Sequence, residues 1–275
     1  MIKQNGLEVN LRPYYQTISG CSTLVSPVGL GTVKFGRNQK VKYKESTFEL
    51  PSDQIIEELL TIAWNAGVNL VDTAPAYGSA EERLGRHLKA QKKQGRNWVI
   101  STKVGEEFVN GESVYDFSQK HLIESVERSL KRLDRETLDL VFLHCPKDDF
   151  SIVDQPEVAA TLNEMKRQGL LRAWGSSTTS LRGGMKALEI ADAVMVAFNK
   201  DYLAELPVIE QALKLKKTVF IKKGLLSGHL DQASLPKSFE AIFNIQPRIT
   251  SLIFGTTNPE NLKANLRAAQ QSLVS

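Results

Sequence analysis

Short apolar segments, rich in β-branched residues, alternate along the chain with segments of helical periodicity. A segment that is apolar at nearly every position predicts a strand buried on both faces, as in a parallel sheet. Apolar positions three and four residues apart predict helices that pack one face on that sheet. The predicted strands lie at 26–32, 68–74, 97–104, 137–145, 170–177, 192–198, 218–224 and 250–257. The predicted helices lie at 52–67, 79–91, 118–133, 156–169, 180–191, 206–216, 237–244 and 258–273.

Several of these helices carry signals at their ends. Ser52 and Ser118 occupy positions typical of an N-cap, whose side chain accepts a hydrogen bond from the first turn. Ser79 precedes an acidic residue by three positions, which predicts a capping box. Gly67 and Gly169 stand where a glycine ends a helix in a left-handed conformation. The helix boundaries are therefore predicted from local chemistry as well as from periodicity.

Eight strand–helix repeats within about 250 residues predict a (β/α)8 TIM barrel. We expect one α/β domain over residues 1–275, in which residues 1–25 form an N-terminal hairpin that closes the bottom. A doubly wound open sheet is the alternative, but it needs a glycine-rich turn that opens a helix after the first strand, and residues 29–36 open none. Residues 36–51 and 105–117 are expected to be loops that shape substrate specificity.

Composition narrows the class of protein further. Hydrophobic residues make up 41% and charged residues 24%, as in soluble globular proteins. A net charge of +4, with no basic cluster interleaved with aromatic residues, argues against a nucleic-acid partner. Two cysteines are no disulfide framework and favour a reduced, cytoplasmic location. No apolar stretch reaches the roughly 18 residues of a membrane span, and no feature indicates an oligomeric state.

Ionisable residues end three successive predicted strands. Asp72 ends the second strand, Lys103 the third and His144 the fourth, and Tyr77 follows Asp72 in a short loop. Each has an ordinary structural interpretation when taken alone: a turn-forming aspartate, a lysine at the barrel rim, a hydrogen-bonded histidine. Adjacent strands of a barrel bring their ends together, at the face where active sites lie. Charged groups there need partners, so we expect the four side chains to form one cluster.

Such a cluster is suited to proton transfer to a carbonyl group. A tyrosine has a pKa of about 10 and donates its proton poorly near neutral pH. A nearby ammonium group lowers that pKa, and a carboxylate holds the ammonium group in place. A histidine hydrogen-bonds the carbonyl oxygen. No side chain supplies a hydride, so a bound nicotinamide is required for reduction.

The segments around these residues resemble the aldo-keto reductases. The matching segments are DTAPAYG (72–78), EERLG (81–85), STKVG (101–105), DLVFLHC (139–145) and GTTNPENL (255–262). The resemblance spans about residues 26–268 and implies a (β/α)8 barrel that uses NAD(P)H. It implies that Tyr77 is the general acid/base, that Lys103 lowers its pKa and that Asp72 holds Lys103. It also implies that His144 orients the substrate carbonyl.

The same resemblance implies a set of cofactor-binding residues near the ends of the other strands. They are Gly31, Thr32, Ser177, Thr178, Asn199, Lys222, Lys223, Gly224, Leu225, Ser227, Gly255, Thr256, Thr257, Asn261 and Asn265. NADP(H) is expected over NAD(H). Gly255 and Asn261 replace a lysine and an arginine that many NADPH-preferring members carry, and Lys263 would be the positive charge that compensates for them.

The sequence departs from the family at the nicotinamide end of this set. Thr178 replaces an amide residue, and Met195 stands where a glutamine usually meets the carboxamide. Lys222 and Lys223 replace the usual stacking aromatic residue and the serine after it. We expect the two lysines to bind phosphate. The alternatives are that both lysines lie in a solvated rim, or that one of them lowers the pKa of nearby groups or contacts an anionic substrate.

These features favour an NAD(P)H-dependent reductase of a small aldehyde or ketone, or the reverse reaction. A cofactor-binding sensor or regulatory subunit with little turnover is the alternative. A metal-dependent hydrolase is the third possibility, but it requires several His or Asp ligands at strand ends. His144 is the only histidine in such a position, so we expect no metal site.

Overall fold

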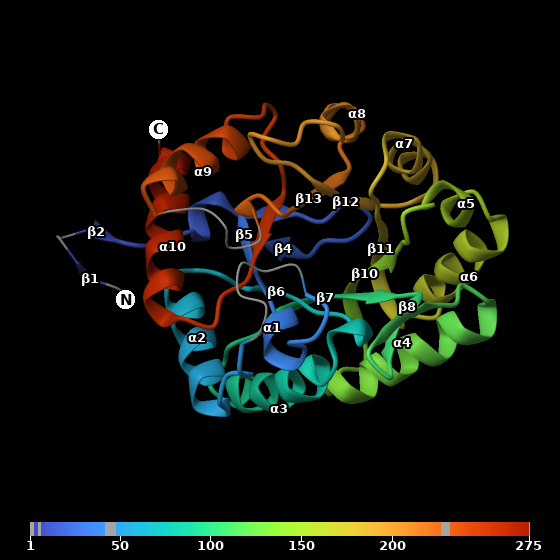
Figure 1. Ribbon diagram of the computed structural model, residues 1–275, viewed down its shortest axis with the longest axis horizontal. Helices are drawn as coiled ribbons and strands as arrows, with labels where there is room; N and C mark the ends of the chain where they lie inside the picture. The colour runs from blue at the N-terminus through green and yellow to red at the C-terminus, as the bar shows by residue number, and fades with distance from the viewer. Residues whose placement is uncertain (1–2, 5–6, 42–47, 227–231, 275) are drawn as a thin grey trace.

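Eight parallel strands close into a barrel at the centre of the computed structural model, which describes residues 3–4, 7–41, 48–226 and 232–274 (Figure 1). In chain order the barrel strands are β5 (Val28–Gly31), β6 (Leu70–Asp72), β7 (Val99–Val104), β10 (Leu138–His144), β11 (Leu171–Ser177), β12 (Ala193–Ala197), β13 (Thr218–Lys222) and β14 (Ser251–Phe254). Each strand pairs with its neighbours in the sequence of barrel strands, and β14 pairs with β5 to close the ring. All eight predicted strands are confirmed.

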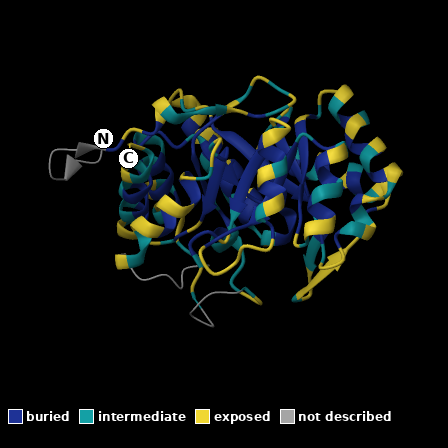
Figure 2. Ribbon diagram, turned by 90° about the horizontal axis from the view of Figure 1, so that it is seen from above, coloured by how far each residue is buried: buried dark blue, intermediate teal, exposed yellow. Residues whose placement is uncertain are grey.

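Helices surround this barrel on its outer side (Figures 1 and 2). The longer ones are α2 (Asp53–Asn65), α3 (Ala80–Lys93), α4 (Gln119–Leu133), α6 (Pro156–Arg167), α7 (Leu181–Ile190), α8 (Leu206–Lys214), α9 (Leu235–Phe243) and α10 (Pro259–Val274). Shorter helical segments are α1 (Val33–Gly36), α5 (Phe150–Val153), η1 (Arg12–Tyr14), η2 (Pro75–Tyr77) and η4 (Gln232–Ser234). The fold is the predicted (β/α)8 barrel.

The helices bury the faces that the apolar spacing predicts. In α2, Ile56, Leu59, Leu60 and Ala63 are buried against the barrel. Burial of each large aliphatic side chain stabilises the fold by about 1.5–3 kcal/mol, whereas differences in helix propensity between ordinary residues are below about 1 kcal/mol. Packing on the barrel therefore stabilises these helices more than their local propensity does. Figure 2 shows the result: the strands of the barrel are dark blue, and the helices carry exposed yellow residues on their outer side.

Most of the predicted helix ends are confirmed. The side chains of Ser52 and Ser118 each accept a hydrogen bond from the first turn of the helix that follows. Gly67 and Gly169 have φ angles of 85° and 78°, in the region that glycine enters without a steric penalty.

The predicted capping box at Ser79 is wrong. The Ser79 side chain makes no cap hydrogen bond. Glu82, which would complete the box, lies instead 3.3 Å from Nε of Arg132 on α4. A contact between two packed helices has replaced the local one.

The interior of the barrel is filled and its N-terminal end is closed. Phe142 and Phe220 meet inside it with their ring centroids 5.6 Å apart. The hairpin of β3 (Gln16–Thr17) and β4 (Leu24–Val25) precedes the first barrel strand. Ile18 and Val25 of this hairpin are fully buried in the same apolar cluster. The closed end leaves the C-terminal ends of the strands as the place for a site.

A second hairpin lies within residues 105–117, where a loop is predicted from the sequence. Strands β8 (Glu106–Val109) and β9 (Glu112–Tyr115) pair antiparallel directly after β7. Asn110 and Gly111 join them with φ angles of 49° and 81°, as in a two-residue type I′ turn. A further pair, β1 (Lys3–Gln4) and β2 (Leu7–Glu8), lies near the N-terminus. No helix in the described part of the chain is both long and apolar enough to span a bilayer.

Candidate active site

The structure brings together the four residues at the ends of the second, third and fourth barrel strands. Asp72 is the last residue of β6, Lys103 lies one residue before the end of β7, and His144 ends β10. The strands are adjacent, because β7 pairs with β6 on one side and with β10 on the other. Tyr77 ends the 3-10 turn η2 and is half-buried.

Lys103 and Asp72 form a buried ion pair. Nζ of Lys103 lies 2.7 Å from Oδ2 of Asp72, and the two residues are only 2% and 3% exposed. Nζ also donates to the backbone oxygen of Thr73 at 2.9 Å, and the Ser101 hydroxyl donates to Oδ1 of Asp72 at 2.9 Å. These extra hydrogen bonds compensate part of the desolvation that a buried ion pair otherwise costs.

The charge of Lys103 acts on Tyr77. The ammonium nitrogen lies 4.8 Å from the centre of the tyrosine ring. Burial by itself lowers the pKa of Lys103, but Asp72 and Tyr77 outweigh it and the pKa lies above its usual range. Burial raises the pKa of Tyr77, and Lys103 opposes that rise. The lysine is therefore charged, and the phenol keeps its proton at neutral pH.

His144 faces both Tyr77 and a carboxylate from the β8–β9 hairpin. Its ring meets the Tyr77 ring edge to face, with centroids 6.1 Å apart. Nδ1 lies 2.6 Å from Oε2 of Glu106, in a short contact whose angle departs from that of a regular hydrogen bond. Burial lowers the pKa of His144, and Glu106 works in the opposite direction. The carboxylate favours the tautomer with its proton on Nδ1.

Sequence reasoning missed Glu106 and also missed Arg37. Arg37 donates from Nη1 to the backbone oxygen of Ala76, at 3.1 Å, next to Tyr77. Its guanidinium group lies 3.6 Å from the ring centroid of Phe108 on β8. Arg37 thus connects the Tyr77 loop to the hairpin that carries Glu106. The Asn-Gly dipeptide at 110–111, flanked by strand-forming residues, was the available signal for that hairpin.

One group of the predicted cofactor residues lies around the ends of β5 and β14. Gly31 ends β5, Gly255, Thr256 and Thr257 follow β14, and Asn261 and Asn265 lie one turn apart on α10. The Thr32 hydroxyl donates to the backbone oxygen of Asp72 at 3.0 Å, so Thr32 also braces the end of β6. Hydroxyl and amide groups beside a helix N-terminus are suited to phosphate oxygens, so this donor set fits the phosphate portion of a dinucleotide.

The other group lies around the ends of β11, β12 and β13. Nζ of Lys222 donates to the Ser177 hydroxyl at 2.8 Å and to the backbone oxygen of Thr178 at 2.7 Å. Burial lowers the pKa of Lys222 to about 8. The Thr178 hydroxyl donates to the buried carboxyl of Glu205 at 3.3 Å.

The residues after β13 have different surroundings. The Asn199 amide donates to the backbone oxygen of Lys223 at 3.2 Å, and the Lys223 side chain is exposed. Gly224 and Leu225 are buried, and Ser227 lies outside the described residues. The two lysines therefore differ: Lys222 turns toward the strand ends, and Lys223 faces solvent.

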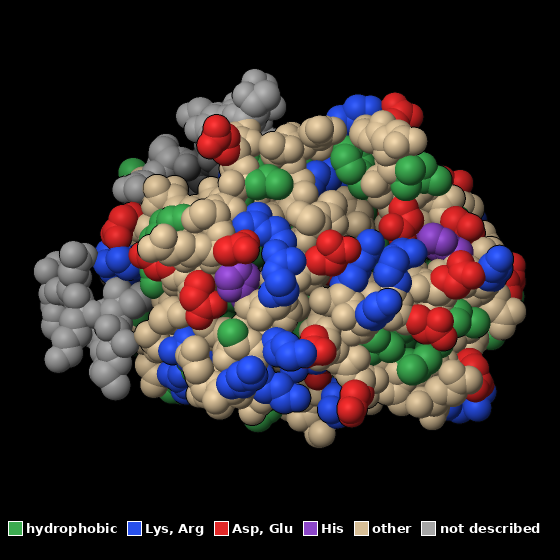
Figure 3. Space-filling model, turned by 90° about the horizontal axis from the view of Figure 1, so that it is seen from below, with side chains coloured by type: hydrophobic (Ala, Val, Ile, Leu, Met, Phe, Trp, Pro, Cys, Tyr) green, Lys and Arg blue, Asp and Glu red, His purple; other side chains and the backbone are tan. Residues whose placement is uncertain are grey.

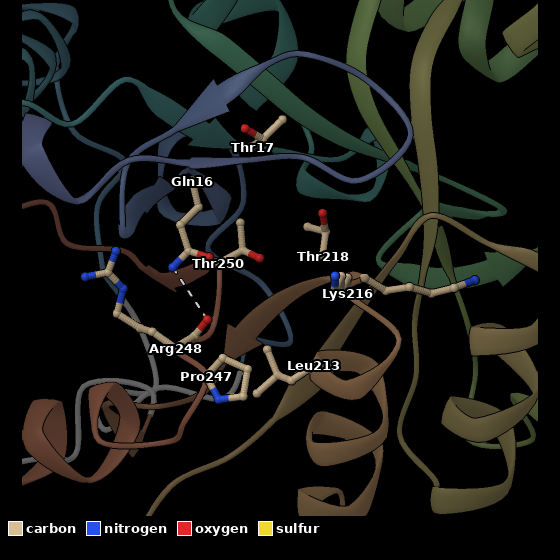
Figure 4. A pocket seen from close by; sticks show the side chains of 9 residues that line it. Gln16, Thr17, Leu213, Lys216, Thr218, Pro247, Arg248 and Thr250 are labelled. Atoms are coloured by element: carbon tan, nitrogen blue, oxygen red, sulfur yellow. Dashed lines mark hydrogen bonds between the residues drawn. The ribbon is translucent and has the colours of Figure 1, made fainter.

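A pocket of about 210 Å³ lies at the opposite, N-terminal end of the barrel (Figure 4). It is lined by Gln16, Thr17, Leu213, Lys216, Lys217, Thr218, Pro247, Arg248 and Thr250. Figure 4 shows the Arg248 guanidinium group on the far side of Gln16 from Thr218, so it is not directed toward the threonines. This pocket is remote from Tyr77.

One face of the surface and the acidic and metal-binding side chains of the described residues can be compared with this site. On the face seen in Figure 3, basic and acidic side chains are intermixed, and the described residues form no continuous basic strip. Within the described ranges, no three His, Cys, Asp or Glu side chains are grouped as metal ligands would be.

Comparison with known proteins identifies relatives over nearly the whole chain. The model of the aldo/keto reductase family matches residues 27–234. A candidate aldo-keto reductase from Pseudomonas aeruginosa is 43% identical, with a TM-score of 0.86 over 96% of this chain and 97% of that one. A second structure described in the same way, from the same species, is 42% identical, with a TM-score of 0.84 and the same coverage. An aldo-keto reductase from Bacillus halodurans in its holo form shares the fold at 18% identity, with a TM-score of 0.70 over 94% and 95% of the two chains.

Proposed function

We propose that this chain, which belongs to the aldo/keto reductase family of oxidoreductases, reduces an aldehyde or ketone to an alcohol or catalyses the reverse reaction. The observation that carries the proposal is the contact chain from Asp72 through Lys103 to Tyr77. It places a buried, charged ammonium group beside a phenol at the face of the barrel where active sites lie.

The chain's own residues supply the proton in this reaction. Tyr77 is protonated at neutral pH and donates its proton to the carbonyl oxygen as the carbon is reduced. Lys103 stabilises the phenolate that remains, and Asp72 keeps Lys103 charged and in place. His144, whose ring meets Tyr77 edge to face, lies where it contacts the same carbonyl group and limits its orientation. In the reverse direction the phenolate takes the proton of the alcohol.

The family uses nicotinamide cofactors, and the donor set around β5, β14 and α10 supports the phosphate portion of one. Gly31, Thr256, Thr257, Asn261 and Asn265 would hold that portion, with NADP(H) preferred over NAD(H). Ser177 and Asn199 would hold the nicotinamide portion. The cofactor, when bound, supplies the hydride that no side chain provides.

Tyr77→Phe tests this function, because it removes the acidic proton and keeps the ring. We expect NADPH-dependent reduction of 4-nitrobenzaldehyde to fall by about 10²–10⁴-fold, with NADPH binding retained in a fluorescence titration. Tyr15→Phe is the matched control, because the Tyr15 hydroxyl contacts the backbone of Gly67 far from this site. If Tyr77→Phe turns over normally, the proposed acid is wrong. If the wild-type protein neither binds nor oxidises NADPH, the proposed reaction is wrong.

A further inference from the structure

We propose that Lys222 is an anion-recognition residue, which binds a carboxylate or phosphate group of a ligand at the C-terminal end of the barrel. The ligand is either a carbonyl substrate that carries a second, anionic group or the cofactor itself. This inference rests on the proposed function for its substrate, and its binding experiment does not depend on turnover.

The contacts of Lys222 provide no countercharge. Its ammonium group donates to a hydroxyl, Ser177 Oγ, and to a backbone carbonyl, Thr178 O. Among the residues that the structure describes, no carboxylate lies within 4.0 Å of it. An ammonium group has three N–H donors, and two of them are used. One donor therefore remains for a partner outside the chain, and none of the atoms bonded to the ammonium group carries a negative charge.

The neighbouring carboxylates are engaged elsewhere. Glu205 accepts hydrogen bonds from the Thr178 hydroxyl at 3.3 Å and from the Ala197 amide at 2.9 Å. Asp149 accepts from the Ser180 hydroxyl and from the Ser180 and Thr179 amides, which fixes the turn before α7. Neither side chain forms an ion pair with Lys222, and Glu205 offsets only part of the effect by which burial lowers the pKa of Lys222.

Lys103, at the same end of the barrel, is a lysine with a countercharge and can be compared with Lys222. It is buried, contacts Asp72 at 2.7 Å and has a raised pKa. Lys222 is half-buried, contacts only neutral acceptors and has a pKa lowered to about 8. A cation taken from water without a partner is unfavourable, and a ligand anion would provide the missing interaction.

The position of Lys222 also indicates how such a ligand would lie. Lys222 ends β13, which is separated from β10 by two strands in the barrel order. Its charge contributes to the lowered pKa of His144, so the two groups share one electrostatic environment. A substrate with its carbonyl at Tyr77 and an anionic group at its other end would extend across the strand ends toward Lys222.

Matched aldehydes test the substrate as the source of the anion. We expect Lys222→Met to reduce kcat/KM for 4-carboxybenzaldehyde by about 10–100-fold relative to 4-nitrobenzaldehyde, which has similar size and no charge. Lys222→Arg keeps the charge and is expected to retain most of the preference. Lys217→Met is the control, because Lys217 precedes the same strand at its opposite end and donates to the backbone oxygen of Ala191. If Lys222→Arg loses the preference as fully as Lys222→Met, the role assigned to the charge is wrong.

Binding measurements test the cofactor as the source. If the anion is a cofactor phosphate, Lys222→Met raises the Kd for NADPH about tenfold or more and lowers turnover of both aldehydes alike. Calorimetric titration with 4-carboxybenzoate and with inorganic phosphate gives a readout that needs no reaction. If Lys222→Met matches the wild type in aldehyde preference, in NADPH binding and in both titrations, the proposal is overturned.

Discussion

Nδ1 of His144 and Oε2 of Glu106 lie 2.6 Å apart, although one residue ends a barrel strand and the other lies on a hairpin outside the barrel. The hairpin therefore contributes directly to the electrostatics of the site. Burial, Lys103 and Lys222 all lower the pKa of His144, and Glu106 is the group that opposes them.

Glu106→Gln should shift the titration of His144 to lower pH, because it removes the charge that stabilises the imidazolium form. The chain has only four histidines, so NMR of the imidazole protons can follow His144 directly. We also expect kcat/KM to fall about tenfold, since an interaction with a charged group is lost. Glu107→Gln is the control, because Glu107 lies next in the same strand and contacts Arg128 and His121 instead of His144. An unshifted His144 titration in Glu106→Gln would contradict the assigned role.

Asp72→Asn should destabilise the protein by about 3–5 kcal/mol, because it leaves the ammonium group of Lys103 buried without a countercharge. Urea unfolding gives the free energy directly. Glu112→Gln removes the carboxylate of an exposed pair with Lys40, whose side chains are 74% and 62% exposed, and should change stability by less than about 0.5 kcal/mol. Equal stability losses in the two variants would show that the Lys103–Asp72 pair is not the buried anchor described above.

Lys222→Met should stabilise the protein in a pH-dependent way. The pKa of Lys222 is about 8 in the folded protein against 10.5 for the ordinary side chain. Below pH 8 both states hold the proton, and the folded state bears the full cost of the charge. Between pH 8 and 10.5 the unfolded chain holds more protons, so wild-type stability recovers as the pH rises.

The stability gain from Lys222→Met is therefore expected below pH 8, at about 1–3 kcal/mol, and should disappear toward pH 10.5. Urea unfolding at pH 7 and pH 10 measures it. Lys216→Met, at an exposed residue on the opposite end of the barrel, should show no such pH-dependent difference. A gain that is equal at both pH values would contradict the assignment of the cost to the charge of Lys222.

The barrel and its catalytic cluster could be predicted because their signals are local. Continuous apolar runs identify strands buried on both faces, and the polar residues that end them meet once the barrel closes. For this reason, the grouping of Asp72, Lys103 and His144 could be predicted without any knowledge of loop geometry.

The contacts that were not predicted depend on where loops and long side chains fold in space. Glu106 reaches His144 because the first strand of the hairpin begins two residues after β7, the strand that pairs with β10. Lys222 reaches Ser177 across the end of β12, which lies between their two strands. At Ser79 the local capping signal was present, but packing of α3 on α4 gave Glu82 a different partner. The periodicity of apolar residues along the chain does not indicate which of these distant side chains will meet.

The hairpin that carries Ile18 and Val25 closes the N-terminal end of the barrel, so a ligand approaches Tyr77 from the C-terminal ends of the strands. Whatever reaches Tyr77 arrives and departs by the same route. An inhibitor bound across the C-terminal ends of the strands would therefore block entry and release of a substrate alike.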